Sequence, residues 1–167
     1  MATREDIQKF WVQTRAALEK VDMDAKVELG LKAFWKDMGR LFQQIVDENE
    51  GIKRLKAEIA KRPAHQTHAQ RIAVGEMVQV ALEAKKEREG DELLSGLKRL
   101  SVEYLLNRTI GDKMLLNAAF LVDQNREKEF DDQVERLDLR YRERLKFAYV
   151  GPVPPYNFVH LALHPEE

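Results

Sequence analysis

The sequence predicts an α+β fold with one four-stranded antiparallel sheet, a layer of helices on one face, and a helix ahead of the first strand. Apolar and polar residues alternate in three short segments, and a fourth segment is almost continuously apolar, as strands require. Between these segments, apolar residues recur every three or four positions, which is the pattern of amphipathic helices. The longest helical region stands between the first two strands, so a long helical insertion is expected there.

A helix is expected before the first strand. Thr3 is a candidate N-cap, and Asp6 stands three positions later, where a capping box places its second member. The residues that follow on one helical face are mostly apolar: Ile7, Phe10, Trp11, Thr14, Leu18 and Val21. We therefore predict a helix within residues 1–24 that leads into a domain over residues 25–167.

The first strand is expected from Val27 to Trp35, where the period changes to two. One face of this strand should be apolar and the other polar. The apolar face consists of Val27, Leu29, Leu31, Ala33 and Trp35. Phe34 must then lie on the opposite face, where the first helix or an insertion helix is expected to cover it. The alternative is that Phe34 is an exposed apolar anchor for a partner.

Helical spacing returns at Leu41, continues beyond Gly51 and ends at Pro63. Thr67 and Gln70 have the spacing of a second capping box. They are expected to open a helix that runs as far as Leu100.

Three features inside that long helix carry their own expectations. Gly75, among branched apolar residues, indicates close packing against another helix. Gly90 is expected to kink or interrupt the helix. The charged run over residues 85–89 is expected to be a solvated overhang.

The second half of the chain predicts a hairpin over residues 102–122, with a turn at residues 110–113. A shorter amphipathic helix follows around Val134, and the last strand starts at Leu145. The resulting order is strand, helices, strand, strand, helix, strand. That order is typical of a ferredoxin-like sandwich with a long insertion between strands 1 and 2.

A proline-rich segment follows the last strand, and three prolines in four positions should end the ladder, because proline lacks an N–H and fixes φ. The apolar side chains of Tyr156, Phe158 and Val159 should dock this rigid turn onto the core.

The composition limits the classes of function. A net charge of −1 argues against a general nucleic-acid binder, which normally carries a basic stripe. The absence of cysteine excludes thiol catalysis and disulfides and fits a cytoplasmic protein. No apolar run is long enough to span a membrane, so no membrane partner is expected.

The sequence predicts no catalytic, cofactor or metal site. His65 with His68, and His160 with His164, could each share a helix face, but neither pair has a third ligand at a fixed spacing. The carboxylates of residues 127–135 alternate with basic residues, as on a charged solvent face. No glycine-rich phosphate loop or nucleophile elbow is present.

Three separated segments carry a family resemblance. Residues 26–35 read KVELGLKAFW, and residues 115–123 read LLNAAFLVD. The third segment carries Gly151, Pro152, Pro154, Pro155, Tyr156 and Phe158. In these segments the chain resembles the GvpF/GvpL family of gas vesicle accessory proteins, whose members typically close with Gly-Pro-Trp-Pro-Pro-Tyr-Ser-Phe. Here Val153 stands in place of the tryptophan and Asn157 in place of the serine. Family members usually carry a further domain ahead of the first strand, so a truncated or short member is expected.

The resemblance implies a non-enzymatic protein of gas vesicles in the cytoplasm. It would bind the hydrophobic shell protein and other accessory proteins during vesicle formation. An aggregation-prone subunit needs a soluble partner that covers its helix or strand edge, so we expect the contact on the helical insertion or the sheet edge. The candidate partner-binding residues are Leu41, Phe42, Ile45, Ile52, Leu55 and Ile59.

A second interpretation stays open. The chain could be a ferredoxin-like domain that binds a small ligand or serves regulation, or even an enzyme, since that fold hosts many functions. A convergent polar pocket with perturbed titratable groups would favour it, and an exposed apolar groove would favour the accessory protein.

Overall fold

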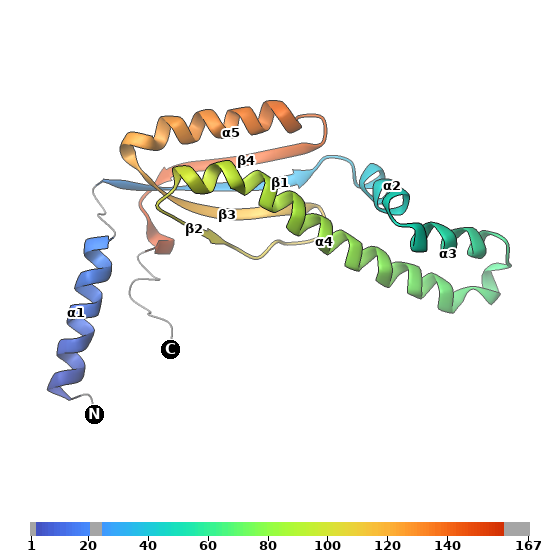
Figure 1. Ribbon diagram of the computed structural model, residues 1–167, viewed down its shortest axis with the longest axis horizontal. Coiled ribbons are helices and arrows are strands. Elements are labelled where there is room, and N and C mark those ends of the chain that lie inside the picture. The colour runs from blue at the N-terminus through green and yellow to red at the C-terminus, as the bar shows by residue number, and fades with distance from the viewer. Residues whose placement is uncertain (1–2, 21–24, 159–167) are drawn as a thin grey trace.

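The computed structural model describes residues 3–20 and 25–158 and contains one four-stranded antiparallel sheet, with the strand order β2-β3-β1-β4. The strands are β1 (Lys26–Trp35), β2 (Glu103–Leu106), β3 (Met114–Asp123) and β4 (Leu145–Val153). The helices are α1 (Arg4–Lys20), α2 (Met38–Glu48), α3 (Glu50–Ala60), α4 (His68–Leu100) and α5 (Glu127–Tyr141). Figure 1 shows α5 and the second half of α4 along one face of the sheet, while α2, α3 and the first half of α4 form an arm beyond its end.

The capping box at the start of α1 is confirmed. The backbone N–H and the hydroxyl of Thr3 donate to one carboxylate oxygen of Asp6 at 2.9 and 2.7 Å, and the Asp6 N–H donates back to the Thr3 hydroxyl at 3.2 Å. These bonds from Thr3 hold the pKa of Asp6 below its usual value. Of the predicted apolar face, Ile7 and Phe10 are half-exposed. Val21, and the side chains of Trp11, Thr14 and Leu18, lie outside the described part of the chain.

The strand assignments are confirmed, with the core on the helix side of the sheet. The alternate residues Leu29, Leu31, Ala33 and Trp35 of β1 are all buried in one hydrophobic core. β3 is a central strand and almost wholly buried. The centre of its Phe120 ring lies 5.0 Å from the centre of the Phe130 ring of α5. Phe34 is only partly buried, and its cover by a helix stays a prediction.

The insertion differs from the prediction at its helix boundaries. The helical stretch predicted from Leu41 to Pro63 is two helices, because Asn49 has extended backbone angles and separates α2 from α3. Thr67 is the N-cap residue of α4, but the predicted capping box is wrong. Its hydroxyl donates instead to the Ala64 carbonyl at 3.1 Å, because a short 3₁₀ turn brings that carbonyl within reach. The predicted interruption at Gly90 is also wrong, since α4 runs through it as one helix.

The predicted packing role of Gly75 is wrong as well. A Cβ at Gly75 would meet no atom within 4 Å, whereas one at Gly51 would lie 3.2 Å from Cε of Met77. The close approach between α3 and α4 is therefore at Gly51.

Replacing Gly75 by alanine is expected to raise the free energy of unfolding by about 0.5–1 kcal/mol, because alanine loses less backbone entropy in a helix interior and has free space here. Urea denaturation followed by circular dichroism measures the change. Gly51→Ala is the matched control and should gain less, because its new methyl group must displace Met77. A loss of stability in Gly75→Ala would contradict the expectation.

The proline-rich segment does not end the ladder where the sequence predicts. β4 continues through Pro152 to Val153, which pairs with Glu28 of β1 across a register shift. This is possible because β4 is an edge strand, where a proline removes no ladder hydrogen bond if its nitrogen faces outward.

The turn after β4 docks through two residues. Pro155 is buried, and Phe158 is buried against Ala119 and Leu121 on the far face of the sheet. Tyr156 is 71% exposed, so its predicted docking role is wrong, and Val159 lies beyond the described residues.

A polar contact reinforces this docking. Asn157 donates through its backbone and side-chain nitrogens to the two carboxylate oxygens of the buried Glu28, at 3.1 and 2.9 Å. The turn is thus held to β1 by a buried carboxylate as well as by apolar packing.

Candidate functional site

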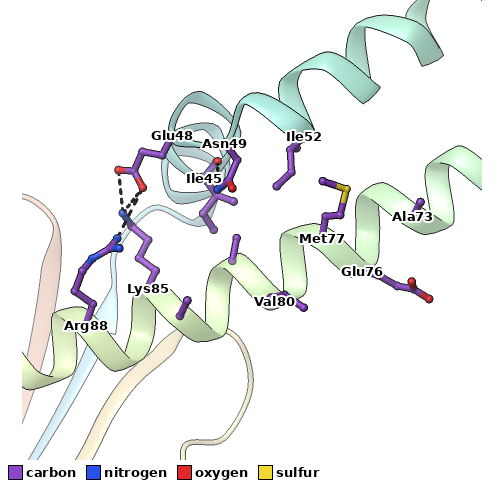
Figure 2. A pocket seen from close by; sticks show the side chains of 12 residues that line it. Ile45, Glu48, Asn49, Ile52, Ala73, Glu76, Met77, Val80, Lys85 and Arg88 are labelled. Carbon is purple, nitrogen blue, oxygen red and sulfur yellow. Dashed lines mark hydrogen bonds and ion pairs between the residues drawn. The ribbon is translucent and has the colours of Figure 1, made fainter.

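A groove of about 700 Å³ runs along the arm, between α2 and α3 on one side and α4 on the other. Figure 2 shows Ile45 of α2, Ile52 of α3 and Met77 of α4 directed into it, with Glu48, Lys85 and Arg88 at one end. The lining is mostly apolar along its length, and Glu76 lies near the other end of the α4 wall. Such a groove can accept an apolar side of another helix.

The predicted partner-binding residues lie in different environments. Leu41, Ile45 and Ile52 are buried, and Phe42 packs against the same core. Leu55 and Ile59 are partly exposed. Ile45 and Ile52 line the groove and the other four do not, so a contact through all six stays a prediction.

The sequence reasoning missed the α4 wall of this groove. Met77 is 37% exposed and Val80 is 72% exposed, and both line it. Together with Ala73 and Ala84 they recur at spacings of four, three and four, which is one face of a helix. That spacing is the signal that could have identified the wall.

The base of the arm holds an ion-pair network. The prediction of a solvated overhang over residues 85–89 is wrong for Lys85, Lys86 and Glu89, whereas Glu87 and Arg88 are exposed. Lys85 is buried, with its ammonium 3.3 Å from Glu48 of α2 and 3.8 Å from Glu89. Glu89 also accepts a hydrogen bond from the indole N–H of Trp35 at 3.1 Å and pairs with Arg144. Lys86, also buried, donates to the Gly111 carbonyl at 3.1 Å. Lysine is rarely buried unless it is paired, and this pairing joins the arm to the sheet.

Titratable groups elsewhere in the described residues do not converge on the groove. Burial, followed by the hydrogen bond to Asp131 at 2.6 Å, raises the pKa of Tyr149, which lies on β4 and not in the arm. His65 and His68 lie in and next to the turn between α3 and α4, and His160 and His164 lie outside the described residues. No cluster of three or more metal-binding side chains occurs within residues 3–20 and 25–158.

The helices of the described residues include none with the length and hydropathy needed to cross a bilayer.

Comparison with known proteins gives a consistent relationship. Residues 4–160 match the family described as gas vesicle synthesis protein GvpL/GvpF. Gas vesicle protein F of Nostoc sp. strain PCC 7120 is 26% identical over 156 residues, which is 93% of this chain and 62% of that protein. Gas vesicle protein F1 of Halobacterium salinarum is 34% identical over a shorter stretch of 71 residues, 42% of this chain and 33% of that one.

Solved structures agree. The crystal structure of GvpF from Anabaena sp. PCC7120 aligns with a TM-score of 0.77 and 26% identity, over 92% of this chain and 61% of that one. GvpF from Microcystis aeruginosa, at 23% identity and a TM-score of 0.70, shares the fold. The chain thus spans about three fifths of the length of the cyanobacterial GvpF chains with solved structures.

Proposed function

This chain belongs to the gas vesicle synthesis protein GvpL/GvpF family. From this membership we propose that it is a gas vesicle accessory protein that binds the hydrophobic shell protein during vesicle formation. Other accessory proteins are further partners in this proposal, and the place of action is the gas vesicle in the cytoplasm. The arm groove is the proposed contact surface. The observation that carries this choice is the exposed apolar wall of Met77 and Val80, which faces the buried Ile45 and Ile52.

The geometry suits a helical partner. Large exposed apolar side chains that gather along a groove are typical of interaction sites, whereas scattered ones are normal on any surface. From Ala73 to Ala84 the α4 wall rises about 17 Å, since a helix advances roughly 1.5 Å per residue, and this length receives about three helical turns of a partner. Charged side chains lie toward both ends, with Glu76 toward the tip of the arm and Glu48, Lys85 and Arg88 toward the sheet.

We also propose that the fold of the domain is ferredoxin-like. Residues 25–167 form a ferredoxin-like domain that follows a helix within residues 1–24. The strand order β4-β1-β3-β2, with helices α4 and α5 on one face, supports this assignment.

Substituting glutamate for both Met77 and Val80 is expected to weaken binding of the hydrophobic shell protein at least tenfold, because it places charges in the apolar wall. Both positions are exposed, so the fold should persist. Co-purification followed by titration of the shell protein of the same genome, with circular dichroism for the fold, measures the effect.

In the matched control variant, glutamate replaces Ile72 and Gln79, which are exposed on α4 but do not line the groove. Equal weakening in both variants would count against the groove as the contact. Saturable binding that survives Met77→Glu with Val80→Glu would place the contact elsewhere. If a small polar ligand is bound while the shell protein is not, the alternative of a ligand-binding ferredoxin-like domain takes precedence.

A further inference from the structure

The free edge of the sheet at β2 presents backbone groups that can pair with another strand. Within the described residues, β2 has a neighbouring strand on one side only, which is β3. The backbone N–H of Asn107 donates to the backbone carbonyl of Asn117 in β3 at 2.7 Å. In the same register, Leu105 pairs with Ala119. Because antiparallel ladders alternate, the N–H and C=O groups of Tyr104 and Leu106 face away from β3.

The side chains of this edge are also exposed. Tyr104 and Leu106 pair with Phe120 and Ala118 of the main core, so they lie on the helix side of the sheet, yet both are exposed. The Lys98 ammonium of α4 lies 4.7 Å from the centre of the Tyr104 ring on that side. An open strand edge beside large exposed side chains is a template for strand addition.

A second groove, of about 460 Å³, lies next to this edge, on the helix side of β2 and beside α4. Leu106 and Asn107 line one wall, and Glu83, Glu87 and Asp91 of α4 line the other. Glu83 pairs with Lys86 at 3.7 Å, whereas Glu87 and Asp91 have no charged partner within 4 Å in the described part of the chain. The wall facing the edge strand is therefore acidic.

We propose that this edge binds an extended basic peptide segment of a partner protein, which adds a strand to β2 and places lysine or arginine side chains against Glu87 and Asp91. The residues of such a strand that point toward α4 must cross the exposed side chain of Leu106 before they reach the carboxylates. Arginine and lysine suit this path, since their apolar stems cover hydrophobic surface while their charged heads reach beyond it. The residues that point to the other face lie beside Leu105, which packs near Phe158, so aliphatic side chains fit there. The expected pattern is an alternation of basic and aliphatic residues.

This inference is independent of the arm groove, because the two grooves lie on different sides of α4 and share only Ala84. Failure of one test leaves the other unaffected.

The test uses the full chain and the fluorescein-labelled peptide Thr-Arg-Val-Arg-Val-Thr-amide, titrated by fluorescence anisotropy at low salt. Replacing Glu87 by glutamine together with Asp91 by asparagine is expected to weaken binding about tenfold, as two partly exposed ion pairs can supply. Glu58→Gln with Glu92→Gln removes the same charge at exposed positions that do not line this groove, and should leave binding within about twofold. A peptide with glutamate in place of arginine should not bind.

Amide hydrogen exchange followed by NMR locates the contact. Bound peptide is expected to slow exchange at Tyr104 and Leu106, while Leu105, which faces β3, should be slow from the start. Any of three results would overturn the inference: no saturable binding up to about 1 mM, affinity unchanged in Glu87→Gln with Asp91→Asn, or binding without protection at those two amides. Protection of Tyr104 and Leu106 in the free protein would also overturn it, since the edge would then already be occupied.

Discussion

Replacing Gly151 by alanine is expected to lower the free energy of unfolding by about 3 kcal/mol, one of the largest effects of a single methyl group in this fold. Two costs combine. Gly151 has φ of +114°, a backbone conformation that side-chain-bearing residues rarely adopt. A Cβ there would also lie 2.8 Å from the Glu28 carbonyl oxygen and 3.0 Å from Cδ2 of Leu29. The carbonyl belongs to β1 in the middle of the sheet, so it cannot yield without disturbing the pairing of β1 with β4. Urea denaturation followed by circular dichroism gives the change.

Gly111→Ala separates the two costs. Gly111 also has a positive φ, of +75°, but a Cβ there would meet nothing within 4 Å. It should therefore lose only about 1–2 kcal/mol, from backbone strain alone. If both variants lost the same amount, the contact with Glu28 would contribute nothing. A loss below about 1 kcal/mol in Gly151→Ala would mean that β4 can shift away from β1 at little cost.

The parts of this fold that sequence reasoning identified are those with strong local periodicity. The two-residue alternation of β1 specifies its buried face, because a shift of one residue would expose the whole apolar set. The 3.6-residue spacing of Phe130, Val134 and Leu137 specifies the buried side of α5 in the same way. In both cases the information lies within one element, so no knowledge of the neighbours is needed.

The parts that it missed depend on residues far apart in the chain. The run over residues 85–89 has the composition of a solvated helix face, and only the fold brings Glu48, Trp35 and Arg144 to it. β4 could continue through Pro152 only because topology makes it an edge strand. The arm groove can be recognised only when the residues of both walls are known. Amphipathic spacing in the short helices identified Ile45 and Ile52 of one wall. It did not identify Met77 and Val80 of the other. Apolar residues lie on more than one side of α4, which obscures its groove face.

Replacing Lys85 by glutamate is expected to lower the free energy of unfolding by about 3 kcal/mol, because it removes the partner-bound charge of a buried lysine, leaves an unpaired carboxylate in its place and adds a like charge. The Lys85 side chain is only 5% exposed, and its ammonium lies between the carboxylates of Glu48 and Glu89. A glutamate there would place three carboxylates at the point where α2 meets α4. Urea denaturation measures the loss, and it should shrink when Glu48→Lys is added, since that change restores an opposite charge beside position 85.

Arg88→Glu is the matched control for the charge change. Arg88 is also near Glu48, at 3.9 Å, but its side chain is 60% exposed, so water screens the pair and the expected loss is below about 1 kcal/mol. Equal losses in the two variants would show that burial of Lys85 adds nothing to the pairing.

The proposed function adds a second readout, because Glu48, Lys85 and Arg88 line one end of the arm groove. If Lys85 holds α2 against α4, it sets the width of that groove. Lys85→Glu should then weaken shell-protein binding under conditions where the variant is still folded. Addition of Glu48→Lys should restore part of the binding affinity. Binding at full affinity by folded Lys85→Glu would mean that the network stabilises the arm without shaping its binding surface.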